Sequence, residues 1–337
     1  VGFGQMVTTM SDHADADLWV VSTGAQSFED LSLIDMSAQR KLLAIKGVAR
    51  ATPVVIGFSD WRPPGGHMTP VFVIGSDLAH GGLQPWNVVA GDVRALSEPD
   101  AVAVDRSYLE RLGISGLGAT AEIHGRKVHV SAVTEGIRSF TTTPYVFTEL
   151  DRARAYLGFP PTKANDFLIK LAPDADRASV VKEIQAGVSD VDVLTPQEFR
   201  DRSKSFWLFG TGAGAALFGG ALLGVIVGTV IVAQTLYAST KDHLIEFATL
   251  RAIGCSKSYI FGVIRVMALL NAVIGFCIAS IIGAIVVEMT AESALPVVIT
   301  PVLVVGLFLL TVLMCTASAL VAIFRVVRID PVVVLSR

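Results

Sequence analysis

Residues 205–240 read SFWLFGTGAGAALFGGALLGVIVGTVIVAQTLYAST, a run of 36 positions without a charged side chain. Two further uncharged runs follow at 266–287 and 293–324. A helix needs about 20 apolar residues to cross the ~30 Å hydrocarbon core of a bilayer. Because soluble proteins rarely contain uncharged runs of this length, the sequence predicts three membrane-spanning helices.

Charged residues are concentrated in the N-terminal part of the chain. The 337 residues are 52% hydrophobic and 17% charged, with a mean hydropathy of +0.59, whereas globular domains average about 25% charged residues. Residues 204–337 hold only 5 of the 30 acidic and 8 of the 27 basic residues. Residues 1–203 therefore have the composition of a soluble domain. With a net charge of −3 and no basic block, the composition disfavours a disordered chain, a wholly soluble enzyme and a nucleic-acid partner.

Basic residues predict the orientation, because they gather on the cytoplasmic side of a membrane. The loop 239–257 carries Lys241, Arg251 and Lys257, and the C-terminal tail carries three arginines. The loop 288–300 carries two glutamates and no basic residue. We therefore expect the first loop and the tail in the cytoplasm, and the N-terminal domain outside.

An exported domain needs a route across the membrane, and no signal peptide is visible. We expect an earlier spanning helix upstream of Val1. The expected fold class is an α-helical membrane protein, with three spans in this chain and a fourth before it, that carries an α+β extracytoplasmic domain. We expect these parts: the end of a truncated first transmembrane helix at 1–10, a two-lobed extracytoplasmic domain at 11–194, a stalk and transmembrane helix at 195–238, a cytoplasmic loop at 239–257, transmembrane helices at 258–287 and 301–328, an external loop at 288–300 and a cytoplasmic tail at 329–337.

The external domain alternates strand and helix signals. Val71–Ile74 is an apolar strand-like run, and Glu122–Val133 is typical of a hairpin that turns at Gly125. Residues 167–194 read as strand, helix and strand. This pattern predicts one lobe built from both ends of the segment and a second lobe inserted between them.

The helix that leads into the membrane has a recognisable start. Thr195 is placed to cap it, Pro196 occupies the first helical position, and Glu198 completes a capping box. Glu198 and Arg202 also stand four apart, in the order that favours an ion pair. If the helix continued without a break to Tyr237 it would be ~63 Å long, so that part of it would project from the membrane as a stalk.

Glycines recur in two places along this helix. Gly210, Gly212 and Gly214 either hinge the helix near the membrane surface or permit close packing, and the sequence leaves both open. Further along, small residues recur every four positions, a spacing that lets two transmembrane backbones approach closely. It predicts a helix–helix interface, either between two copies of the chain or within one, at Ala216, Gly220, Gly224 and Gly228.

The chain contains no visible source of energy or catalysis. The three uncharged runs lack the ionisable groups that ion-driven carriers place at membrane depth. No Walker A motif, GxxxxGK[ST], and no GxSxG nucleophile motif is present. The three cysteines have no metal-site spacing, and the histidines are scattered. We therefore predict no catalytic, cofactor-binding or metal site, and energy supplied by another subunit.

The cytoplasmic loop has the pattern of a short amphipathic helix that Gly254 would end. Its apolar stripe consists of residues spaced three apart: Leu244, Phe247, Leu250 and Ile253. Such a ridge either docks into a groove on a partner or lies in the lipid interface.

This loop resembles a known family. Residues 246–255 (EFATLRAIGC) are similar to the coupling-helix signature of FtsX/MacB-type ABC transporter permeases, and 328–332 (RIDPV) is similar to their terminal motif. Residues 233–244 (AQTLYASTKDHL) look closest to the DevC branch, which is associated with glycolipid-like cargo. Over residues 1–203 the resemblance rests on domain size, position and a strand-like start at Asp17.

The resemblance implies a homodimer of permeases in the bacterial inner membrane, with residues 11–203 in the periplasm. Two separate ATPase subunits would bind ATP and Mg²⁺, and their closure would pass along the stalks to the periplasmic domain, a process called mechanotransmission. The expected ATPase-coupling residues are Leu244, Glu246, Phe247, Leu250, Arg251, Ile253 and Gly254.

For function, the resemblance implies efflux of an amphiphilic, glycolipid- or drug-like cargo. The expected partners are membrane lipid, a periplasmic adaptor (membrane fusion) protein and an outer-membrane channel. Two alternatives in the same superfamily remain open, an FtsX-like regulator of a cell-wall hydrolase and a lipoprotein-releasing permease. The sequence does not identify the cargo.

Overall fold

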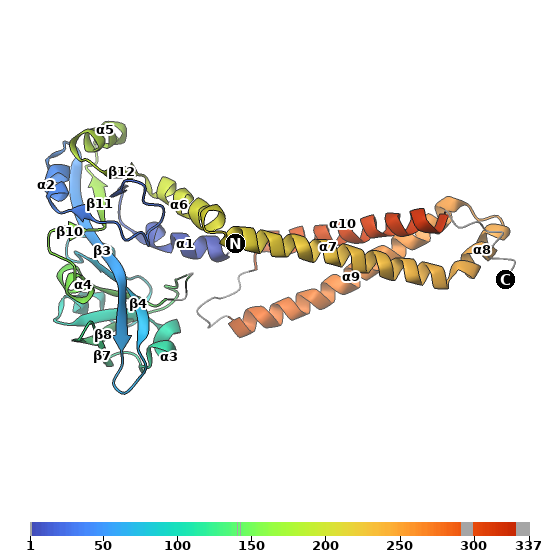
Figure 1. Cartoon of the computed structure of the whole chain (residues 1–337), viewed down its shortest axis with the longest axis horizontal. Helices are drawn as coiled ribbons and strands as arrows, with labels where there is room; N and C mark the ends of the chain where they lie inside the picture. Colours follow the sequence, from blue (N-terminus) through green and yellow to red (C-terminus); the bar gives the residue numbers. More distant parts are fainter. Residues whose placement is uncertain (1, 140, 142, 291–298, 328–337) are drawn as a thin grey trace. The chain divides into compact units, whose positions relative to one another are not determined.

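The computed structural model describes residues 2–139, 141, 143–290 and 299–327 (Figure 1). The chain forms two compact units, with the boundary between Thr211 and Gly212. The helices of the first unit are α1 (Gly2–His13), α2 (Ser37–Ala44), η1 (Val93–Ser97), η2 (Arg106–Tyr108), α3 (Leu109–Leu112), α4 (Leu150–Leu157), α5 (Arg177–Gly187), α6 (Pro196–Ser205) and the π-helical turn η3 (Phe206–Gly210). Its strands are β1 (Leu18–Ser22), β2 (Ile34–Asp35), β3 (Val48–Arg62), β4 (Thr69–Ser76), β5 (Val88–Gly91), β6 (Ala101–Asp105), β7 (Thr120–Ile123), β8 (Arg126–Thr134), β9 (Tyr145–Glu149), β10 (Lys163–Ala164), β11 (Asp166–Leu171) and β12 (Val191–Leu194).

Ten of the described strands form one sheet in the order β12-β1-β11-β3-β4-β9-β6-β8-β5, with β7 paired to β3 and β8. Neighbours are antiparallel, except that β4 runs parallel to β9 and β6 parallel to β8. The long strand β3 pairs with β11 over residues 48–54 and with β4 over residues 54–61. Strands β12, β1 and β11 come from the two ends of the extracytoplasmic domain, and most other strands come from its middle. Strand β3 joins these two groups into one continuous sheet.

A hydrophobic cluster covers each face of this sheet. Successive strand residues point to opposite faces, so Val55 and Val104 belong to one cluster while Ile56 and Ala103 belong to the other. The first cluster includes side chains of α2, α3, α4 and α5, and the second includes side chains of α1 and α6. Because both faces are covered, the first unit has a hydrophobic core of its own.

The strand and hairpin predictions for this unit are confirmed. Val71–Ile74 lies within β4, and β7 and β8 form an antiparallel hairpin. The hairpin turns through His124 and Gly125, whose φ angles of 50° and 73° suit a type I′ turn. Strand β11, helix α5 and strand β12 follow in the predicted order, and β1 lies between the two strands and antiparallel to both.

The capping box at the start of α6 is also confirmed. The Glu198 amide donates to Thr195 Oγ1 (3.2 Å), and the Thr195 amide donates to the Glu198 carboxylate (2.7 Å). The predicted ion pair between Glu198 and Arg202 is wrong. The cap holds the Glu198 carboxylate, and Arg202 instead bonds Asp192 at 2.6 Å.

The helix that leads to the membrane is interrupted. After α6 come the π-helical turn η3 and then Gly212, whose φ of 74° is a left-handed conformation that favours glycine. A new helix, α7 (Ala213–Asp242), begins there. An unbroken helix from Thr195 to Tyr237 is therefore wrong, and the break lies at one of the glycines whose role the sequence left open.

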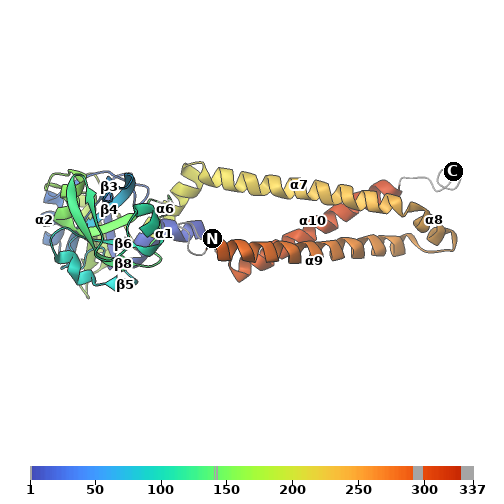
Figure 2. The ribbon, with the colours of Figure 1, turned by 90° about the horizontal axis from the view of Figure 1, so that it is seen from below.

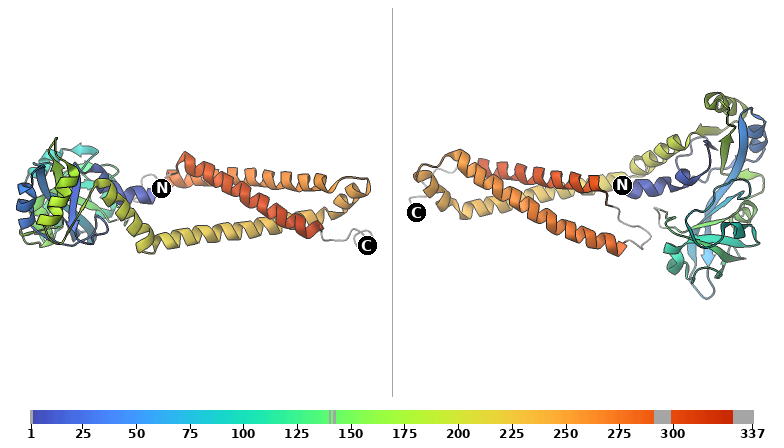
Figure 3. Two further views of the ribbon diagram at one scale, coloured as in Figure 1. Left: turned by 90° about the horizontal axis from the view of Figure 1, so that it is seen from above. Right: turned by 180° about the vertical axis from the view of Figure 1, so that it is seen from behind.

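The second unit contains three long helices, α7, α9 (Lys257–Thr290) and α10 (Pro301–Val327), with the short α8 (Leu244–Ala252) after α7 (Figures 1 and 2). Three segments are long and apolar enough to cross a membrane: Gly214–Asp242, Ser258–Thr290 and Pro301–Ala319. Helix α10 packs against both α7 and α9, and the three helices can be followed in Figures 2 and 3. Ser318 of α10 donates a hydrogen bond to the Thr229 carbonyl of α7 (3.0 Å), which ties the two helices together.

Candidate functional site

The short helix α8 is held at both ends by local bonds. At its start, the His243 ring lies 3.1 Å from the Glu246 carboxylate. At its end, the Cys255 amide donates to the Leu250 carbonyl (3.0 Å) across Gly254, whose φ is 101°. The prediction that Gly254 ends this helix is confirmed. The loop 239–257 therefore presents a defined helical turn.

The apolar side chains of this loop divide into two groups. Phe247 is half-buried against a cluster of membrane-helix residues that includes Leu236, Ile260 and Ile264. Ile245 and Ile253 are 70% and 74% exposed. Phe247 therefore anchors the loop to the helices beneath it, while the two isoleucines offer apolar surface.

The other predicted coupling residues are placed as follows. Leu250 is half-buried, and the Glu246 side chain is exposed. The side chains of Leu244 and Arg251 lie outside the described part of the chain. Sequence reasoning missed Ile245, because it lies beside the three-residue stripe. A second helical pattern could have found it. Ile245, Thr249 and Ile253 are four residues apart, a spacing that puts them on one face, and all three are exposed in the structure.

The small residues of α7 do not share one environment. A Cβ added at Gly228 would lie 2.9 Å from Met314 Cε on α10, so Gly228 serves packing within the chain. A Cβ at Gly220 or Gly224 would meet nothing within 4 Å, and Ala216 is exposed. Within the described residues the stripe therefore packs inside the chain at Gly228, while Gly220 and Gly224 are exposed.

The described residues contain no group of three His, Cys, Asp or Glu side chains that could hold a metal ion. The external loop 288–300 lies outside the described residues at 291–298, and so do residues 328–337 with the terminal motif.

Two protein families match this chain. The MacB-like periplasmic core domain matches residues 1–186, and the FtsX-like permease C-terminal domain matches residues 218–331. Since the first match alone covers more than half of the sequence, the chain belongs to the FtsX/MacB-type permeases. The predicted family and fold class are confirmed: three candidate membrane helices follow an α+β MacB-like periplasmic domain.

Solved structures similar to this chain include the periplasmic region of MacB from Actinobacillus actinomycetemcomitans, at 10% identity and a TM-score of 0.44 over 58% of this chain and 96% of that one. The extracellular domain of the ABC-type transporter YknZ from Gram-positive bacteria is similar at 13% identity and a TM-score of 0.39, over 53% and 99% of the two chains. A comparison with curated proteins gives no match. The family is that of ABC transporter permeases, whose ATPase is typically a separate subunit.

Proposed function

We propose that this chain is the permease subunit of an exporter in the bacterial inner membrane. ATP and Mg²⁺ would bind a separate ATPase subunit, and its motion would pass through the membrane helices to the periplasmic residues 11–203. The cargo would be amphiphilic, of glycolipid or drug type, and would leave through a periplasmic adaptor and an outer-membrane channel. The observation that carries this proposal is the cytoplasmic loop, where Ile245 of α8 and Ile253, which directly follows α8, lie exposed in a chain of this family.

The proposed docking surface consists of Ile245 and Ile253, with Glu246 at its edge. Burying a large aliphatic side chain contributes about 1.5–3 kcal/mol, so two exposed isoleucines favour a partner with an apolar groove. Phe247 supports this surface from beneath, because it packs on the membrane-helix cluster. Leu244, Leu250, Arg251 and Gly254 remain proposed members of the coupling element.

The test places a charge on this surface. In the Ile245→Asp, Ile253→Asp double variant, we expect the affinity for the ATPase to fall about tenfold or more. The variant loses the burial of two apolar side chains, and two carboxylates would have to be desolvated on binding. The measurement is co-purification of the ATPase with the full chain in detergent. Ser258→Asp is the matched control, since Ser258 is exposed at the start of α9 and lies outside the proposed surface. Unchanged association in the double variant would contradict docking at α8.

Export is distinguished from the alternatives by the periplasmic partner. Cross-linking of the full chain in cells should capture an adaptor protein if the chain exports cargo. Capture of a cell-wall hydrolase would instead indicate a regulator, and capture of lipoproteins would indicate a lipoprotein-releasing permease.

A further inference from the structure

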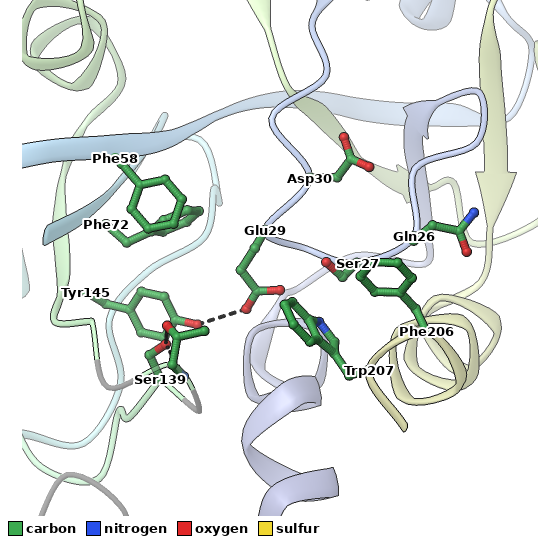
Figure 4. A pocket seen from close by; sticks show the side chains of 11 residues that line it. Gln26, Ser27, Glu29, Asp30, Phe58, Phe72, Ser139, Tyr145, Phe206 and Trp207 are labelled. Carbon is green, nitrogen blue, oxygen red and sulfur yellow. Dashed lines mark hydrogen bonds between the residues drawn. The ribbon is translucent and has the colours of Figure 1, made fainter. Parts of the chain in front are cut away.

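The periplasmic unit contains an aromatic pocket with an acid at its base (Figure 4). Its volume is about 280 Å³. Phe58 and Phe72 come from β3 and β4, Tyr145 from β9, and Trp207 from the turn η3, so residues from four elements line the pocket. Neither the predicted coupling loop nor the glycine stripe contributes to it.

The acid is Glu29, which follows β1. Its Oε1 accepts a hydrogen bond from the Tyr145 hydroxyl (3.1 Å), drawn as a dashed line in Figure 4. Its Oε2 is buried. Burial raises the pKa of the Glu29 carboxyl, and the bond from Tyr145 and the nearby Ser27 and Trp207 side chains offset part of this rise.

The remaining lining side chains favour a cation. Glu29 and Asp30 are acidic, and no Lys, Arg or His is among the described residues that line the pocket. The aromatic rings are arranged edge to face, with Phe58 against Phe72 (4.9 Å between centroids) and Phe72 against Tyr145 (5.7 Å). Phe58 stands at the opening with 54% of its surface exposed. Aromatic faces beside a carboxylate are the chemistry that recognises organic ammonium groups.

We propose that this pocket binds the protonated amine of a small organic cation, with the Glu29 carboxylate as the acidic partner and the surrounding rings as cation–π partners. The volume accommodates a headgroup or a compact molecule, since drug-sized sites usually exceed about 300 Å³. Phe206 and Trp207 belong to η3, immediately before the helix break at Gly212, so a bound amine would contact the segment that connects to the membrane helix. The proposal concerns binding alone and does not depend on export through an outer-membrane channel.

The test uses the full chain in lipid nanodiscs and 2-phenylethylammonium as the probe. We expect a saturable change in tryptophan fluorescence at about pH 8, where a primary amine is protonated. The neutral 2-phenylethanol and the anionic phenylacetate provide comparison, and we expect neither to saturate. In Trp207→Phe the fluorescence change should disappear, while calorimetry still detects binding of the probe.

Variants decide whether Glu29 is the acceptor. Glu29→Gln should weaken probe binding by about tenfold or more, since a charge-assisted bond is lost. Glu110→Gln is the matched control, because Glu110 is exposed on α3 and does not line the pocket. If Glu29→Gln fails to fold, the exposed Phe58→Leu should weaken binding by about threefold through the lost ring face. Equal binding of the alcohol, or an unchanged affinity in Glu29→Gln and Phe58→Leu, would overturn the proposal.

Discussion

At the scale of single residues, Asp166 is one group that links the stability of the periplasmic unit to pH. It lies buried on β11, and burial, together with the charge of Asp30, raises the pKa of its carboxyl well above the ordinary value of 3.8. The folded state therefore holds the proton more tightly than the unfolded state does. The stability that Asp166 contributes is largest at low pH and falls as pH rises from about 4 through the raised pKa.

Asp166→Asn should remove this decline. We expect the thermal unfolding midpoint of the variant to increase relative to that of the wild type as pH rises from about 4 to about 8. Tryptophan fluorescence of the full chain in detergent is a suitable measurement, because all four tryptophans lie before Gly212. Asp176→Asn is the control, since hydrogen bonds from Ser179 lower the pKa of Asp176 and give its contribution the opposite pH dependence. A constant difference between Asp166→Asn and wild type at every pH would contradict the assignment.

At the scale of elements, the success of sequence reasoning depends on how local each signal is. Thr195 and Glu198 are three residues apart, and their capping box was predictable from spacing alone. The partner of Arg202 was not, because the cap occupies Glu198 and folding brings Asp192 within reach. The pocket has no local signal at all, since Glu29 and Tyr145 are 116 positions apart.

The break between α6 and α7 gives the prediction at this scale. Gly212→Ala places a Cβ on a residue with a φ of 74°, which costs about 1–2 kcal/mol for residues other than glycine. We expect the tryptophan-detected unfolding midpoint to fall by about 2–4 °C per kcal/mol, because Trp207 lies in the adjoining turn. Gly219→Ala is the control, since Gly219 is helical and its added Cβ would meet nothing within 4 Å. An unchanged midpoint in Gly212→Ala would mean that the segment adopts a helical path at no cost.

At the scale of the whole molecule, α7 packs within the chain along one part of its length and is exposed along another. Helix α10 packs against α7 at Gly228, where Met314 lies against the glycine, and further along at Leu236. Gly224 and Gly220 lie about one and two turns before Gly228, and a Cβ added at either would meet nothing within 4 Å. Because van der Waals packing of small residues drives helix association in lipid, these two glycines are our proposed contact between two copies of the permease.

Gly224→Leu tests this contact. A leucine side chain at this position would keep the two backbones apart, so we expect the dimer to dissociate about tenfold more readily, as single-molecule photobleaching in nanodiscs would measure. Gly275→Leu is the matched control, because Gly275 is an exposed glycine of α9 where an added Cβ meets nothing within 4 Å. Gly228→Leu should instead lower the stability of each copy, because the leucine side chain would clash with Met314. A dimer that survives Gly224→Leu but dissociates in Gly275→Leu would place the interface on α9.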